Sequence, residues 1–145
     1  MIYVGNIHDT DILHRDWDKK YAIVRSYKNQ TCIFEQKAIL SPSTELFFTY
    51  RKLVKYCKWN KDSFDKYYVP KFLQQMQGRE EKDALNQLYV MSKTQNIILV
   101  CFCENEALCH RSIVAGLLSG AGAEVQTSSG HNYDKYWDMY HNLCN

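Results

Sequence analysis

The chain has 145 residues, of which 46% are hydrophobic and 23% are charged, as is typical of one globular domain. This composition excludes a disordered tail, a collagen-like repeat and a small fold held only by disulfides. Eighteen Lys and Arg against sixteen Asp and Glu give a formal net charge of +2, which is too small for a protein that coats nucleic acid.

The apolar runs and the first residues of the chain indicate a cytoplasmic protein. The longest unbroken apolar run, residues 97–103, is far shorter than the roughly 20 residues of a membrane-spanning helix. Residues 1–6 lack the basic start and the long apolar stretch of a secretory signal. We therefore expect no membrane partner, and we expect the six Cys to be reduced thiols rather than a disulfide framework.

The first half of the chain predicts two strands followed by a block of helices. Residues 2–4 and 21–24 are short apolar runs typical of buried strands, and the polar stretch 9–20 between them carries an apolar stripe at helical spacing. A further extended segment is expected within residues 31–40. Helical patterns then cover residues 41–57, 62–78 and 79–93. Pro70 should kink or split the middle one, and Asp62 or Ser63 should cap its start.

The second half predicts the centre of a parallel sheet. Ile97–Cys103 is apolar throughout, which is typical of an inner strand covered on both faces. A polar loop then leads to a helix over 112–118, a strand over 123–127 and a helix over 133–144. This order predicts one three-layer α/β domain over residues 1–145, with a mostly parallel sheet and a helical insertion in the middle. Residues 127–145 form its C-terminal extension.

Residues that carry chemistry are concentrated between the inner strand and the next helix. Residues 101–112 lie where open α/β sheets bind ligands, beyond the carboxyl ends of the strands. Backbone N–H groups at the start of the helix favour an anion there, and Arg111 adds a planar donor fork suited to phosphate. Cys109 and Ser112 complete this predicted binding site. Next to a helix N-terminus and a histidine, the Cys109 thiol should have a lowered pKa.

Glu104 and His110 are the candidate catalytic residues of the same stretch. We interpret Glu104 as a general base or a ligand of ribose hydroxyls, and His110 as the group that carries a proton near neutral pH. Plainer roles stay open. Arg111 could form a surface ion pair with a neighbouring glutamate, His110 could cap the helix, and Cys101 and Cys103 could be small packed side chains.

The cysteines of this stretch are not predicted to hold a metal. Zinc would use Cys101, Cys103, Cys109 and His110, but the usual Cys-x2–4-Cys spacing is absent, and adjacent Cys109 and His110 should not face one ion. A Cys-dependent phosphatase needs Cys, five residues and then Arg, and this chain has Asn105 at the Cys position. Adjacent Cys and His do not supply the geometry of a papain-like nucleophile. We therefore expect neither a metal nor another cofactor.

A second group of polar residues follows the first two predicted strands. These residues are Gly5, Asn6 and His8 after the first strand and Arg25, Ser26 and Tyr27 after the second. If both strands run parallel to Ile97–Cys103, their ends share one edge of the sheet. Arg25 and Arg111 would then hold one phosphate or two linked phosphates, with Asn6 beside them.

Aromatic residues make up 14% of the chain, mainly through eleven Tyr. Tyr50, Tyr67 and Tyr68 on the predicted helices would wall the pocket and stack on a base. Each of them also fits an ordinary place in the core or at its rim.

Several of these features follow one another in a familiar order. A hydrophobic strand, an acidic residue, a short loop and Cys-His-Arg at the start of a helix cover Ile97–Arg111, and Leu40-Ser41-Pro42-Ser43 and Phe64–Tyr68 match further motifs. Over residues 1–126 the chain resembles the bacterial and phage family called domain of unknown function 488. The resemblance implies a compact α/β fold and a ligand site at the Cys-His-Arg loop, without a settled reaction. Ala22-Ile23-Val24 departs from that family, which has a Ser-rich approach to its Arg.

The sequence thus predicts a domain that binds a small nucleotide-like or phosphorylated molecule and hydrolyses a phosphoester or N-glycosidic bond. A first alternative is a non-catalytic phage or bacterial protein that sequesters a nucleotide signal in the same pocket. A second alternative is a nucleic-acid-binding protein. It would use a basic cluster that also fits a solvated helix face, formed by Lys52, Lys55, Lys58, Lys61 and Lys66.

Overall fold

The computed structural model describes residues 1–25 and 34–143. Within these ranges it contains a five-stranded sheet with the strand order β3-β2-β4-β1-β5. The strands are β1 (Ile2–Asn6), β2 (Lys19–Ala22), β3 (Glu35–Gln36), β4 (Ile97–Cys101) and β5 (Val125–Thr127). Each neighbouring pair is parallel, which confirms the predicted α/β class.

β4 is the central strand, as its apolar sequence predicts. It pairs with β1 on one side and with β2 on the other, and all of its residues are buried. A strand covered on both faces has no polar side, which explains the unbroken apolar run. β4 ends at Cys101, two residues before the predicted end. The carbonyl oxygen of Cys103 has left the sheet and accepts hydrogen bonds from the side chains of Asn6 and Arg111 instead.

The first part of the chain differs in detail from its prediction. β1 continues through Gly5 to Asn6. β2 begins at Lys19, two residues before the predicted apolar run 21–24. The helix expected within residues 9–20 is only α1 (Thr10–Leu13). It is short because Trp17 folds back, donating from Nε1 to the Ile12 carbonyl oxygen at 2.8 Å and packing against the Tyr3 ring at 5.8 Å between centroids.

The predicted helical insertion is confirmed, but Pro70 does not split it: the backbone stays helical from residue 61 to residue 75 and changes from a π-helical to an α-helical turn at Val69. It consists of η1 (Ala38–Leu40), α2 (Thr44–Lys55), α3 (Lys61–Ser63), the π-helical turn η2 (Phe64–Tyr68) and α4 (Val69–Gln75). Pro70 lies at the start of α4, where its missing N–H is tolerated. The N-cap of α3 is Asn60 rather than Asp62 or Ser63. Of the extended segment expected within 31–40, only β3 is a strand in the described part, and residues 31–33 lie outside it.

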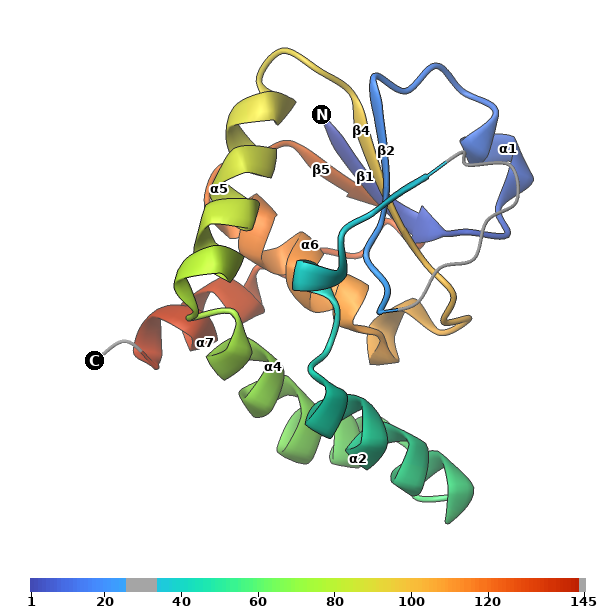
Figure 1. Cartoon of the computed structure of the whole chain (residues 1–145), viewed down its shortest axis with the longest axis vertical. Coiled ribbons are helices and arrows are strands. Elements are labelled where there is room, and N and C mark those ends of the chain that lie inside the picture. Colours follow the sequence, from blue (N-terminus) through green and yellow to red (C-terminus); the bar gives the residue numbers. More distant parts are fainter. Residues whose placement is uncertain (26–33, 144–145) are drawn as a thin grey trace.

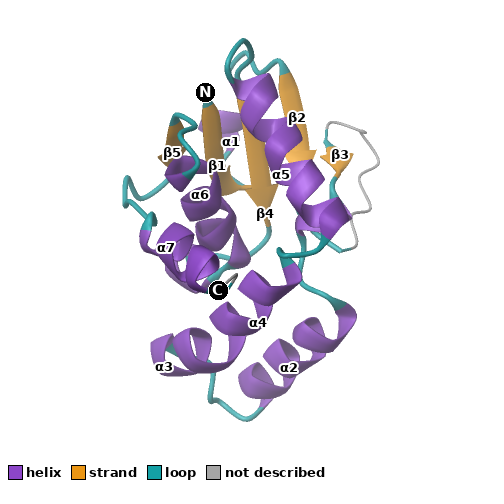
Figure 2. Cartoon of the chain, turned by 90° about the vertical axis from the view of Figure 1, so that its left-hand side faces the viewer, coloured by secondary structure: helices purple, strands orange, loops and turns teal. Residues whose placement is uncertain are grey.

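Four helices follow α4 along the chain. They are α5 (Arg79–Ser92), η3 (Glu106–Leu108), α6 (His110–Gly120) and α7 (Lys135–Asn142). α5 and α6 lie on one face, while α1 lies on the other (Figure 1). Figure 2 shows α2, α3 and α4 beyond the arrowhead of β4, at the carboxyl end of the sheet. In residues 1–25 and 34–143, no helix is long and apolar enough to cross a membrane.

The C-terminal extension packs closely on α6. A Cβ atom on Gly116 would lie 2.1 Å from the Tyr133 carbonyl oxygen, and one on Gly120 would lie 2.2 Å from the Trp137 Cβ atom. Both positions therefore need glycine to let the two segments approach. Tyr136 of α7 is buried in the resulting contact. α6 itself starts at His110, two residues before its predicted start, so Arg111 lies in its first turn.

Candidate functional site

Three cysteines and one histidine meet at the carboxyl end of β4. Cys101 ends β4, Cys103 lies in the following loop, Cys109 directly precedes α6, and His110 is the first residue of α6. The Sγ atom of Cys101 lies 3.9 Å from that of Cys103 and 3.5 Å from that of Cys109. The Nδ1 atom of His110 lies 3.7 Å from the Cys109 Sγ atom and 4.0 Å from the Cys101 Sγ atom. We call these four residues the thiol–imidazole cluster.

Cys109 and His110 do face one point, although their adjacent positions predict that they should not. Their Sγ and Nδ1 atoms are neighbours, and both lie beside the Cys101 thiol. The reason is the backbone: Cys109 is extended, with φ −120° and ψ 145°, whereas His110 begins the helix. In a strand, consecutive side chains point to opposite faces. Because the backbone turns between Cys109 and His110, their side chains point toward each other instead. The cysteines of the cluster are free thiols in this structure.

Three residues predicted to bind a ligand instead hold the backbone of the cluster. Asn6 donates from Nδ2 to the carbonyl oxygen of Cys103 at 2.8 Å, and Arg111 donates from Nη1 to the same oxygen. Ser112 donates from Oγ to the carbonyl oxygen of Cys109 at 2.8 Å. Arg111 is only 2% exposed, and within the described ranges no carboxylate forms an ion pair with it. These contacts make Asn6, Arg111 and Ser112 positioning residues for the thiols.

Hydrogen bonds distribute the protons of the cluster. The Nε2 atom of His110 lies 2.6 Å from the Ile23 carbonyl oxygen, which can only accept, so Nε2 carries a hydrogen and Nδ1 faces the thiols. Hydrogen bonds with Cys103 and Cys109 lower the pKa of the Cys101 thiol. Burial raises the pKa of Cys109, so the prediction of a lowered pKa for Cys109 is wrong. The thiol with the lowered pKa is that of Cys101. Burial lowers the pKa of His110, but the charge of Cys101 and the hydrogen bonds with Cys101 and Ile23 together outweigh burial, so the net pKa is raised.

A cavity lined by five Phe, Tyr and Trp side chains lies over the cluster, and we call it the aromatic cavity. Its volume is about 430 Å³, within the range of about 300–1,000 Å³ that is common for ligand pockets. It is lined by Val24, Arg25, Pro42, Phe47, Tyr50, Trp59, Tyr68, Cys101, Phe102, Cys103, Leu108, Cys109 and His110. Tyr50 and Tyr68 thus line the pocket as predicted. Tyr67 does not, because its side chain points outward and is 48% exposed.

Arg25 is the only Lys or Arg residue that lines the aromatic cavity among the described residues. It follows β2, and its Nη1 atom donates to the carbonyl oxygen of Pro42 at 3.2 Å. Its guanidinium carbon lies 5.8 Å from the centroid of the Phe47 ring. These two contacts hold a positive charge at the wall of an otherwise apolar space. Ser26 and Tyr27, predicted beside it, lie outside the described residues.

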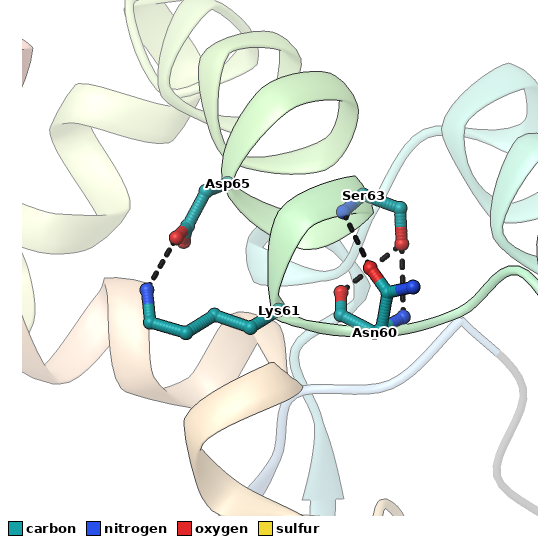
Figure 3. A network of polar contacts seen from close by, with 4 residues as sticks. All are labelled: Asn60, Lys61, Ser63 and Asp65. Carbon is teal, nitrogen blue, oxygen red and sulfur yellow. Dashed lines mark hydrogen bonds and ion pairs between the residues drawn. The ribbon is translucent and has the colours of Figure 1, made fainter.

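The start of α3 positions the aromatic wall. Asn60 accepts from the backbone N–H of Ser63 at 2.9 Å, and the Ser63 hydroxyl accepts from the backbone N–H of Asn60 at 2.9 Å, a reciprocal capping box (Figure 3). Trp59 directly precedes this cap. Its ring packs against Tyr50 and Tyr68 with centroid separations of 4.7 Å and 5.6 Å. Sequence reasoning missed Trp59, although an aromatic residue before an Asn-x-x-Ser cap is a usable signal.

A second cavity, which we call the polar cavity, lies on the other side of residues 102–109, the cysteine loop between β4 and α6. Its volume is about 560 Å³, and its lining includes Arg111 together with the carboxylates of Asp9, Glu104 and Glu106. Glu106 is 7% exposed and accepts from the Tyr133 hydroxyl at 2.7 Å and from the Ser129 hydroxyl. Three carboxylates against one guanidinium make this cavity unfavourable for phosphate.

The residues predicted for the site are therefore divided between two cavities. Arg25, Cys109 and His110 line the aromatic cavity, Asn6, Glu104 and Arg111 line the polar cavity, and Ser112 is fully buried. The structure does not bring Arg25 and Arg111 to one cavity as a phosphate clamp. Nor does it bring Glu104 and His110 to one cavity as an acid–base pair. Glu106 was missed, because its partner Tyr133 lies 27 residues further along the chain.

Comparison with known proteins identifies the family. No curated protein and no solved structure matches this chain. A family model described as the active DUF488-N3 subclade matches residues 14–122, which is more than half of the sequence and includes the Cys-His-Arg motif. The match begins directly after α1 and ends two residues after α6, inside the expected range of 1–126. The chain therefore belongs to the DUF488 family, in the subclade DUF488-N3a.

Proposed function

We propose that the chain binds a phosphorylated, nucleotide-like molecule in the aromatic cavity. The observation that carries this proposal is the combination of aromatic walls with a single cationic side chain. Tyr50, Trp59 and Tyr68 present ring faces and edges, and Arg25 is the only Lys or Arg among the lining residues. Stacking of a base on an aromatic side chain contributes about 1–3 kcal/mol. The guanidinium of Arg25 offers the planar donor fork that recognises phosphate.

The polar cavity fits this ligand less well, although it contains Arg111. The carboxylates of Glu104 and Glu106 line the same space as Arg111. A phosphate there would face more negative than positive charge. The phosphate site that the sequence predicts at Arg111 is therefore moved, in this proposal, to Arg25.

Hydrolysis of the bound molecule is the second function that we propose. It is supported by the placement of His110 and three thiols on the wall of the same cavity, and by the family's description as an active subclade. His110 would carry a proton to or from the reacting group. Glu104 has no part in this version, because it lines the other cavity. If the chain hydrolyses its ligand, the bound nucleotide is converted to product. If the chain sequesters its ligand, the nucleotide is released unchanged.

Tryptophan fluorescence tests the binding proposal. We expect nucleoside mono-, di- and triphosphates and dinucleotides to quench the emission of Trp59, because a base stacked in the cavity contacts its indole ring. Trp59→Phe should remove the quenching, whereas the matched control Trp137→Phe should keep it, since Trp137 packs against Gly120 between α6 and α7. Equal quenching in both variants would place the ligand elsewhere. Affinity for an oligonucleotide that falls steeply with salt would favour a nucleic-acid-binding protein instead.

A further inference from the structure

We propose that the thiol–imidazole cluster is a binding site for a thiophilic divalent metal ion, with zinc as its first candidate. The ligands would be the three Sγ atoms of Cys101, Cys103 and Cys109 and the Nδ1 atom of His110. Thiolate and imidazole are the ligands that zinc prefers in proteins, and three cysteines with one histidine are a common tetrahedral set. This proposal does not depend on nucleotide binding, and it is an alternative to the proton-transfer role of His110, because Nε2 donates to Ile23 and a metal on Nδ1 leaves no free ring nitrogen.

The spacing of the ligand atoms is close to what a tetrahedral ion requires. With Zn–S bonds near 2.3 Å, two thiolates on one zinc ion lie about 3.8 Å apart. The observed Sγ separations are 3.9 Å between Cys101 and Cys103 and 3.5 Å between Cys101 and Cys109, and all three Sγ atoms lie within 4.8 Å of one another. The Nδ1 atom of His110 lies 3.7 Å and 4.0 Å from two of these sulfurs. His110 is not among the ligand atoms that all lie within 4.8 Å of one another, so its Nδ1 atom must move closer to the Cys103 Sγ atom for one ion to bind all four residues.

The hydrogen bond of His110 selects the nitrogen that a metal needs. Because the carbonyl oxygen of Ile23 accepts from Nε2, the hydrogen of a neutral imidazole is held on that atom. The lone pair of Nδ1 then points toward the sulfurs. Metal-bound histidines usually donate their other ring N–H to a carbonyl or carboxylate, and this contact fixes the ring orientation. His110 has such a contact without being at the surface, since it is 5% exposed.

The backbone around the cysteines is fixed by side chains that would form the outer shell of the site. Asn6 and Arg111 both donate to the carbonyl oxygen of Cys103, and Ser112 donates to that of Cys109. The Arg111 guanidinium also places a positive charge beside a set of thiolates whose total charge would exceed that of a divalent ion. The Cys-His-Arg motif thus supplies two ligands and one outer-shell residue. Cys103 is the least buried cysteine of the cluster and lines the aromatic cavity, which provides an entry path.

Cobalt titration tests the site directly. The full chain is purified with reductant, stripped of metal with a chelator and titrated first with Co²⁺ and then with Zn²⁺. We expect one Co²⁺ per chain, with the intense visible bands of tetrahedral thiolate coordination, and stoichiometric displacement by Zn²⁺. Cys103→Ser should lose these bands. Cys57→Ser is the matched control and should retain them, because Cys57 is an exposed thiol that follows α2.

Thiol alkylation provides a second readout that needs no substitution in the site. Bound Zn²⁺ should protect Cys103 from alkylation and leave Cys57 reactive, as followed by peptide mass spectrometry. The proposal is wrong if the wild-type chain gives only the weak spectrum of octahedral Co²⁺, or if Zn²⁺ leaves the alkylation of Cys103 unchanged. If Cys103→Ser fails to fold, as judged by circular dichroism, the wild-type spectrum and the alkylation pattern decide the question.

Discussion

Replacing Tyr133 with Phe tests how the C-terminal extension holds the cysteine loop. The Tyr133 hydroxyl is buried and donates to Glu106 at 2.7 Å, and Glu106 lies between Cys103 and Cys109 in the loop. The substitution keeps the ring and removes only this hydrogen bond. A hydrogen bond to a charged group contributes about 1.5–3 kcal/mol, so the melting temperature of a chain of this size should fall by about 5–10 °C.

The assay is thermal unfolding of the wild type, Tyr133→Phe, Glu106→Gln and the double variant. Because the hydrogen bond is shared, the two single effects should not add, and the cycle should give a coupling above about 0.5 kcal/mol. Tyr67→Phe is the matched control, since Tyr67 is 48% exposed, and its effect should stay within about 0.5 kcal/mol. Additive effects of Tyr133→Phe and Glu106→Gln, or a Tyr133→Phe chain as stable as the wild type, would refute the reasoning.

Gly116→Ala should destabilise the chain by about 1–3 kcal/mol in denaturant unfolding, because its Cβ atom would lie 2.1 Å from the Tyr133 carbonyl oxygen, and an unchanged midpoint would contradict the packing. Asn6→Ala should weaken Zn²⁺ binding by about 10–100-fold in a competition assay with a chromophoric chelator, because an outer-shell donor to Cys103 is lost. Burial and the hydrogen bond to Glu106 raise the pKa of Tyr133 to about 12 in the folded chain, above its ordinary value near 10. The stability that Tyr133 adds should therefore be complete below pH 10 and shrink as the pH rises toward 12, and a stability difference from Tyr133→Phe that stays constant over this range would count against it.

Local sequence patterns predicted the parts of the fold that depend on local physics. The unbroken apolar run before Cys101 required burial on both faces, and only an inner strand of a parallel sheet provides this. Pro70 lies where a π-helical turn changes to an α-helix, because it lacks the N–H that a regular helix interior needs. Topology then placed the cysteine loop at the carboxyl edge of the sheet, as expected for a ligand site.

Contacts between distant parts of the chain could not be predicted from these patterns. Glu106 and Glu104 look alike in the sequence, and only the return of the chain at Tyr133 makes Glu106 a buried hydrogen-bond acceptor. Arg111 has the charge of a phosphate ligand, yet the end of β4 directs a carbonyl oxygen toward it. The meeting of Cys109 and His110 depends on one backbone turn, which residue spacing does not specify.

Calorimetric titration of the wild-type chain with a nucleotide and with its unphosphorylated nucleoside tests the central claim most directly. If Arg25 binds the phosphate and the aromatic wall binds the base, the nucleotide should bind at least about tenfold more tightly than the nucleoside, from about 1.5 kcal/mol or more for a charged hydrogen bond. Arg25→Ala should remove most of this difference, whereas Arg79→Ala, a control on the exposed first turn of α5, should leave it unchanged. Equal affinities for nucleotide and nucleoside, or binding of neither, would contradict the claim that the aromatic cavity is a nucleotide site.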